Sequence, residues 1–171
     1  MKTFDIFTDG STTNNCRLSK KARGGVGVYC PKKKIKRGEP FYIFPITNQR
    51  CEIYATIRAI EIFMKKKKTD EKVKIRILTD SKYLINSMTK WIKMWKLRGW
   101  KKANGTEPTN MDLIYWLDAL TQQHKDQIEI TYKHVKAHKK EPNKNSPDYY
   151  FWKGNDTADK LANKGRRIGC N

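Results

Sequence analysis

The sequence predicts an α/β fold in which three antiparallel strands are followed by two more strands that are joined through helices. Two observations lead to this prediction. Short apolar segments separated by turn residues open the chain, and from residue 51 onward the apolar positions recur at helical spacing. A chain of 171 residues is long enough for one domain with a proper core and short for two. We therefore expect residues 1–171 to form a single domain.

The first half of the chain predicts a meander of three strands. Residues 3–8, TFDIFT, are typical of a strand that ends at the turn signal Asp9-Gly10-Ser11. Residues 24–30, GGVGVYC, predict a second strand whose glycines suit close contact with its neighbours. The segment PKKKIKRG resembles a hairpin connection, and FYIF at 41–44 is the expected returning strand. Such short connections favour antiparallel pairing.

The second half alternates helices with strands. Apolar residues at 53, 57, 60 and 64 predict a long helix that ends in the four lysines of 65–68. The remaining elements are expected as a strand over 73–78, a helix over 82–98, a helix over 111–124 capped by Asn110, a strand over 128–135, and a helix from Asn155 to Lys164. Because helices connect the later strands, we expect those strands to run parallel to the first.

The charge of the chain predicts a polyanionic partner. Thirty-seven Lys and Arg against 17 Asp and Glu give a net charge of +20, and the basic residues gather at 31–37, 65–68, 90–102 and 133–140. Nucleic acid is the natural inference. There is no run of 18 apolar residues and no apolar signal region at the N-terminus, so we expect no membrane partner and an intracellular protein. The segment PKKKIKR also resembles a nuclear-localisation signal, which leaves cytoplasm and nucleus both open.

Four carboxylates stand at positions where they could meet. Asp9 and Asp80 end two strands in the same way, in IFTDGS and ILTDSK. Either one alone is ordinarily a turn or cap residue, but two on neighbouring strands would converge on one side of the sheet. Glu52 opens the first long helix and Asp159 lies early in the last one, where each could instead serve the helix dipole.

Clustered carboxylates repel one another and raise each other's pKa values, so such a cluster stays ionised only beside cations. Oxygen ligands without His or Cys suit Mg²⁺ or Mn²⁺. Two such ions can serve phosphodiester hydrolysis. A basic chain with an acidic metal site therefore predicts a nuclease.

Five motifs are similar, in their order and spacing, to those of ribonuclease H: TDGS, TNQRCE, TDSKYL, WIKMWKLRGWKK and GNDTADKLA. The resemblance spans Phe4 to Gly165 and is to the cellular type 1 enzymes, which cut the RNA strand of RNA/DNA hybrids. It implies a ribonuclease H-like fold, with a five-stranded mixed sheet flanked by helices. It also implies hydrolysis with two Mg²⁺ ions, or Mn²⁺ in their place, leaving 5′-phosphate and 3′-hydroxyl ends. The implied metal ligands and catalytic residues are Asp9, Glu52, Asp80 and Asp159.

The resemblance assigns further roles. His138, in VKAH, matches a histidine that assists proton transfer or product departure. Three residues match those that read the 2′-hydroxyls of the RNA strand: Asn15, Asn48 and Gln49. Four match contacts to the DNA strand, with Thr47 and Asn110 at a phosphate and Tyr83 and Trp91 in a channel.

Two segments qualify the resemblance. Residues 90–102 resemble the basic protrusion of the family, in which Trp95 and Trp100 are expected to hold the segment together. The family often has an arginine two residues before Thr47, where this chain has Pro45.

The stretch between His138 and the last helix is longer than the resemblance requires. Fifteen residues, 139–153, separate His138 from Gly154, about ten more than a short loop of this kind needs. We interpret it as an insertion in an active-site loop. It could be a surface excursion whose aromatic residues 149–152 pack against the last helix, or its lysines 139, 140 and 144 could add contacts to the hybrid.

The sequence leaves other functions open. A hybrid-binding module without catalysis would keep the fold and the basic surface, although its expected signature is the loss of a carboxylate. A DNA-directed nuclease or strand-transfer enzyme of the same fold is the other alternative, against which TNQR and the Trp-rich segment count. Analogy with the family predicts a monomer, and residues 165–171 form a short basic tail.

Overall fold

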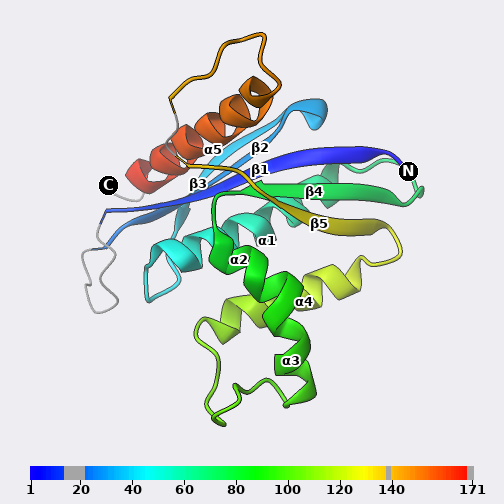
Figure 1. The fold of residues 1–171 in the computed structure, drawn as a ribbon, viewed down its shortest axis with the longest axis vertical. Helices are drawn as coiled ribbons and strands as arrows, with labels where there is room; N and C mark the ends of the chain where they lie inside the picture. The colour runs from blue at the N-terminus through cyan, green and yellow to red at the C-terminus, as the bar shows by residue number, and fades with distance from the viewer. Residues whose placement is uncertain (14–21, 138–139, 169–171) are drawn as a thin grey trace.

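The computed structural model of the protein describes residues 1–13, 22–137 and 140–168. Its centre is a five-stranded sheet in the order β3-β2-β1-β4-β5 (Figure 1). The strands are β1 (Thr3–Thr12), β2 (Gly24–Cys30), β3 (Ile35–Phe41), β4 (Val73–Thr79) and β5 (Ile128–His134). The first three pair antiparallel, while β4 is parallel to β1 and β5 is parallel to β4. The predicted mixed sheet is confirmed.

Helices cover both faces of this sheet (Figure 1). They are α1 (Asn48–Lys66), α2 (Lys82–Asn86), α3 (Ile92–Leu97), α4 (Met111–Gln123) and α5 (Asp148–Ile168). Alternate side chains of β1 face opposite layers, as the pleat of a strand requires. Phe4 meets Phe63 of α1 with 5.2 Å between ring centroids, and Phe7 meets Tyr150 of α5 at 5.6 Å. Within the described ranges, no helix is long and apolar enough to cross a lipid bilayer.

The glycines of β2 make room for α5. A Cβ atom on Gly27 would lie only 2.1 Å from the carbonyl oxygen of Ala158 in that helix. The predicted close contact is therefore with a helix that lies across β1, β2 and β3. This close approach sets how near α5 comes to Asp9, because Asp9 and Gly27 are partners in the sheet.

Two strand predictions were wrong at their ends. The turn expected at Asp9-Gly10-Ser11 does not form, because pairing with β2 continues to Thr12, opposite Gly24. The third strand is Ile35–Phe41 and not residues 41–44, because Pro31–Lys33 form a single 3-10 turn and the chain then reverses. Only the two ends of β3 are buried, which is why its basic interior did not show the pattern of a strand.

Helix predictions were wrong in three details. The helix expected over 82–98 contains a π-helical segment, Ser87–Trp91, between α2 and α3. Asn110 precedes α4, but with φ of 65° its side chain does not cap that helix. The last helix begins at Asp148 and not at Asn155, so residues 148–153 are helical and Asp159 lies in the middle of α5.

The added turns of α5 are anchored on the sheet. Tyr150 donates a hydrogen bond from its hydroxyl to Oδ2 of Asp5 at 2.8 Å, and Asp5 accepts two more from Arg76, at 2.7 and 2.9 Å. The ring of Phe151 lies beneath the guanidinium of Arg76, and the ammonium of Lys133 lies 5.2 Å from the ring centroid. The aromatic residues 149–152 are thus part of the last helix, and the expectation that they pack against it from outside was wrong.

Replacing Tyr150 with Phe should cost about 1 kcal/mol of unfolding free energy at pH 7, because one hydrogen bond to a charged carboxylate is lost at a partly exposed site. Burial alone would raise the pKa of Asp5, but hydrogen bonds from Arg76 and Tyr150 outweigh it and lower that pKa below 3.8. A lowered carboxyl pKa contributes stability above pH 3.8 that is lost as the pH falls through the folded-state value.

The difference in unfolding free energy between Tyr150→Phe and the wild type should therefore shrink below pH 3.8. Urea unfolding followed by circular dichroism over a pH series would show this. Tyr149→Phe is the matched control, because the hydroxyl of Tyr149 has no hydrogen-bond partner among the residues described. A loss of stability that is equal in both variants, or that does not change with pH, would contradict the role of Asp5.

Candidate active site

The register of the sheet brings Asp9 and Asp80 together. β1 and β4 run parallel with Phe7 opposite Leu78, and each aspartate follows two residues later on its own segment. The backbone N–H of Gly10 donates a hydrogen bond to Oδ1 of Asp9 at 2.9 Å, which fixes that carboxylate at the edge of the site. The two carboxylates therefore meet where β4 ends.

Glu52 joins them because α1 lies very close to β1. A Cβ atom on Gly10 would lie 2.6 Å from Cβ of Cys51 and 2.9 Å from the backbone nitrogen of Glu52. Only glycine permits this approach. As a result, one carboxylate oxygen from each of Asp9, Glu52 and Asp80 lies within 4.8 Å of the others.

The environment of these carboxylates disfavours their negative charge. Asp9 is 4% exposed and Glu52 is 7% exposed. Burial, with further contributions from the charges of Asp80 and Asp159, raises the pKa of Asp9 to about 8. Burial, followed by the charge of Asp9, raises the pKa of Glu52 well above its ordinary value. A bound cation would remove the conflict between the buried charges.

The donor set fits a divalent metal ion. Oε2 of Glu52 is buried and has no hydrogen-bond partner within the described part of the chain. Three carboxylates at this spacing offer the oxygen ligands that Mg²⁺ and Mn²⁺ prefer. A buried carboxylate that keeps one oxygen unpartnered and lies beside two further carboxylates is the arrangement expected of a metal ligand.

Asp159 approaches the same carboxylates from α5. Its neighbour Ala158 packs on Gly27, the sheet partner of Asp9, and the charge of Asp159 is close enough to raise the pKa of Asp9. The side chain of Asn163 donates a hydrogen bond to Oδ2 of Asp159 at 3.5 Å and accepts one from the hydroxyl of Ser11 at 2.6 Å. Asn163 therefore ties the fourth carboxylate to β1.

The four residues predicted to contact a DNA strand are connected by side-chain contacts, with Arg50 between Thr47 and Asn110. Thr47 caps α1, and its hydroxyl accepts a hydrogen bond from the backbone nitrogen of Arg50. Nη1 of Arg50 lies 3.5 Å from Oδ1 of Asn110, whose amide nitrogen donates to the hydroxyl of Tyr83 at 3.1 Å. The rings of Tyr83 and Trp91 meet edge to face, with 5.9 Å between centroids.

Arg50 is a residue of this region that the sequence did not single out. It is 3% exposed and makes two hydrogen bonds to the carboxylate of Asp112, at 2.8 and 2.7 Å. Together with Pro45 and Asn110 it lines a cavity of about 380 Å³. Its place within TNQR was the available signal, but its partner Asp112 is 62 residues away and no local pattern connects them.

The other predicted residues lie as follows. Asn48 and Gln49 are exposed in the first turn of α1, where the hydroxyl of Thr12 donates to Oδ1 of Asn48 at 2.9 Å. His138 and Asn15 lie outside the described residues. In the segment expected to resemble a basic protrusion, Trp95 is 9% exposed and Trp100 packs against Tyr115 at 5.2 Å between centroids.

Comparison with known proteins gives a consistent result. The family model described as RNase H matches residues 1–167. A protein named Ribonuclease H from Ruthia magnifica subsp. Calyptogena magnifica is 37% identical over 158 residues, which cover 92% of this chain and 91% of the relative. Human Ribonuclease H1 is 34% identical over 167 residues, which cover 95% of this chain and 49% of that protein.

Solved structures agree with the fold. The solution structure of the PFV RNase H domain superimposes with a TM-score of 0.70 at 23% identity, covering 96% of this chain and 94% of that domain. LC11-RNase H1, solved in complex with an RNA/DNA hybrid, gives a TM-score of 0.59 at 21% identity, with 98% and 99% of the two chains covered.

Proposed function

This chain belongs to the ribonuclease H family, and we propose that it is an endonuclease that hydrolyses the RNA strand of RNA/DNA hybrids. The observation that carries this proposal is the convergence of Asp9, Glu52 and Asp80, with a buried Glu52 oxygen left for a ligand. We propose that residues 1–171 act as one catalytic domain and as a monomer. The products would carry 5′-phosphate and 3′-hydroxyl ends.

Four carboxylates would hold two Mg²⁺ ions, with Mn²⁺ as the alternative: Asp9, Glu52, Asp80 and Asp159. When bound, these ions would supply the positive charge that activates water and stabilises the leaving oxygen. The protein contributes rigid placement. Gly10 N–H orients Asp9, and Asn163 holds Asp159 against β1. A water would attack in line with the leaving 3′-oxygen, and His138 would assist proton transfer or product departure.

Substrate contacts would extend from both sides of the carboxylates. Asn48 and Gln49 stand in the same helix as Glu52, so amides that read 2′-hydroxyls would lie beside the scissile phosphate of an RNA strand. The line from Thr47 through Asn110 and Tyr83 to Trp91 would follow the DNA strand, with Asn15 as a further RNA contact. The net charge of +20 supports a long polyanionic substrate.

The proposal is tested with end-labelled RNA/DNA hybrid, RNA duplex and DNA duplex, each incubated with the protein in Mg²⁺ and in chelator. We expect cleavage of the RNA strand of the hybrid in Mg²⁺ alone. Cleavage of the DNA duplex, or cleavage that persists in chelator, would contradict it. Hybrid that is bound but remains intact in Mg²⁺ would instead favour a hybrid-binding module without catalysis.

A further inference from the structure

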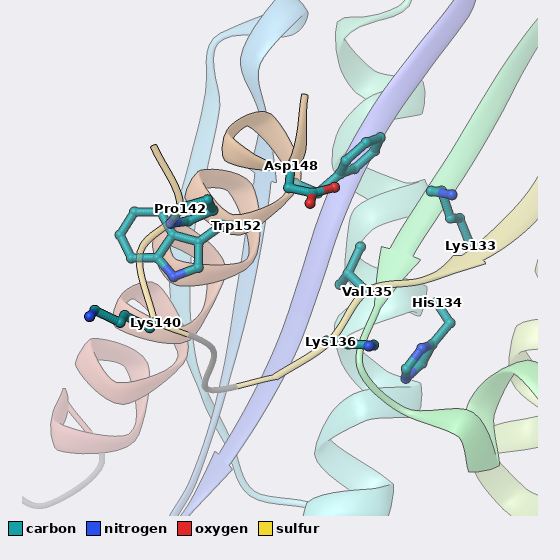
Figure 2. Close-up of a pocket in the computed structure, with 9 residues that line it drawn as sticks. Lys133, His134, Val135, Lys136, Lys140, Pro142, Asp148 and Trp152 are labelled. Carbon is teal, nitrogen blue, oxygen red and sulfur yellow. The ribbon is translucent and has the colours of Figure 1, made fainter. Parts of the chain in front are cut away.

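A second cavity, of about 450 Å³, lies between the end of β5 and the first turns of α5 (Figure 2). Its volume is within the range of sites that bind small ligands. The apolar part of its lining is Val135, Pro142, Phe151 and Trp152. Three of these four side chains belong to the insertion between His138 and Gly154, so the cavity exists because of that insertion.

The rim of this cavity is cationic. Lys133, Lys136 and Lys140 line it together with His134, and Asp148 is the acidic residue of the lining. Figure 2 shows Lys140 on the side of Pro142 and Trp152 with its ammonium directed outward, and Lys136 beside His134 on the opposite side. Among residues that the structure describes, Lys136 and Lys140 have no ion-pair partner. Two such ammonium groups are available to an incoming anion.

The cavity adjoins the carboxylates. His134 is the sheet partner of Thr79, and the backbone N–H of Val135 donates to the carbonyl oxygen of Thr79 at 2.9 Å. Thr79 immediately precedes Asp80. The His134–Val135 end of the cavity therefore lies close to Asp80 in the sheet, on the side from which a strand bound at the carboxylates can continue toward it.

An apolar floor between two cationic sides matches a nucleotide within a strand, with the base and sugar against the floor and its two flanking phosphates toward Lys136 and Lys140. A base that is paired within the hybrid has its faces stacked and its edge occupied, so it cannot enter. We propose that this cavity binds an unpaired nucleotide of the RNA strand, next to the end of the hybrid. This inference rests on the proposed function, because it takes the RNA to be the strand at the carboxylates.

The test measures the affinity of the full chain for labelled hybrids by fluorescence anisotropy, with Mg²⁺ and the substitution Asp9→Asn to prevent cutting. The hybrids are blunt, extended by unpaired RNA at either end, or extended by unpaired DNA on the other strand. We expect an RNA extension at one of its ends to strengthen binding about tenfold, and a DNA extension to add little beyond the blunt hybrid. A gain of equal size from the DNA extension would overturn the assignment.

The double variant Lys136→Gln/Lys140→Gln should remove the gain and lower the slope of log affinity against log salt by about 2. Lys68→Gln/Lys72→Gln is the matched control, because it removes the same charge from exposed positions before the start of β4, at the opposite end from Asp80. That control should keep the full gain. An RNA gain that survives Lys136→Gln/Lys140→Gln, or that is absent from the parent protein, would overturn the inference.

Two further outcomes separate this inference from the proposed function and from binding of an acidic protein. Cleavage of blunt hybrid by the wild type, with no effect of any extension, would leave the proposed function standing and overturn this inference alone. If no extension strengthens binding, and a polyglutamate peptide binds the parent protein but not Lys136→Gln/Lys140→Gln, the cavity would belong to an acidic protein partner and the inference would also fail.

Discussion

Replacing Asp9 with Asn should reduce the rate of hybrid cleavage roughly 1000-fold or more, because a loss of about 4 kcal/mol in transition-state stabilisation corresponds to three powers of ten. Asn keeps the volume of the side chain and an Oδ1 acceptor for Gly10 N–H, so the fold is preserved. It removes the charge that would hold a cation beside Glu52 and Asp80. Hybrid affinity should change little, since the substrate contacts lie elsewhere.

The same substitution should raise the midpoint of thermal unfolding in chelator. Asp9 is buried among carboxylates whose oxygens lie within 4.8 Å, so replacing it relieves repulsion that no ion then offsets. Asp70→Asn, on an exposed loop, is the matched control and should change neither rate nor melting midpoint. Cleavage within tenfold of the wild type would show that Asp9 is not a metal ligand, whatever happens to the melting midpoint.

The meeting of Asp9 and Asp80 could be predicted from the sequence because it follows from the parallel register of two strands, although β1 continues past Asp9 and does not end there. Asp9 and Asp80 end similar motifs, and parallel pairing of β1 with β4 puts them side by side. The supporting residues could not be found in this way. Gly10 is needed because a Cβ atom there would clash with Cys51 and the backbone of Glu52. Asn163 is needed because it accepts a hydrogen bond from Ser11, which lies 152 residues earlier in the chain. Such relations exist only after folding.

The fold was predicted best where periodicity was strong, and apart from the π-helical segment Ser87–Trp91 the errors fell at element ends. β1 continues past Asp9 because β2 offers it hydrogen-bond partners, a tertiary effect that outweighs the turn preference of Asp-Gly-Ser. The start of α5 carried a signal that was missed. Ser146 accepts a hydrogen bond from the backbone nitrogen of Asp148, and Pro147 stands where a helix tolerates proline.

The length of α5 determines how the insertion should be tested. Removing residues 141–151 as a block would also remove the hydrogen bond between Tyr150 and Asp5 and the packing of Phe151 on Arg76. A loss of activity could then come either from lower stability or from weaker substrate binding. Single-site changes at Lys136 and Lys140 alter the charge of the cavity and leave the anchor intact, so they separate binding from stability.

The insertion therefore has two regions with different tasks. Residues 148–151 attach the helix to β1 and β4 through Tyr150, Phe151 and their partners. Residues 140–142 reach the rim of the cavity through Lys140 and Pro142, while Phe151 both packs on Arg76 and lines the cavity. Stability and substrate binding should accordingly respond to different substitutions within one loop, as Tyr150→Phe and Lys140→Gln would show side by side.

Replacing Gly27 with Ala should destabilise the protein by about 3 kcal/mol, or roughly 6–12 °C in melting midpoint, because the new methyl group would lie 2.1 Å from the carbonyl oxygen of Ala158. The clash is with backbone, so α5 must move away from the sheet. Asp159 moves with it, and the rate of hybrid cleavage should fall even at temperatures where the variant is fully folded.

Gly105→Ala is the matched control for Gly27→Ala. Gly105 has φ of 83° and nothing within 4 Å of its would-be Cβ, so the cost is only the ~1–2 kcal/mol of left-handed backbone, with no change in rate. Adding Ala158→Gly to Gly27→Ala should not restore stability, because the oxygen that clashes belongs to the backbone of residue 158. Melting curves and initial cleavage rates are measured for Gly27→Ala, Gly105→Ala and Gly27→Ala/Ala158→Gly beside the wild type. A Gly27→Ala protein that melts with the wild type, or recovers with Ala158→Gly, would show that α5 is not held at Asp9 by this contact.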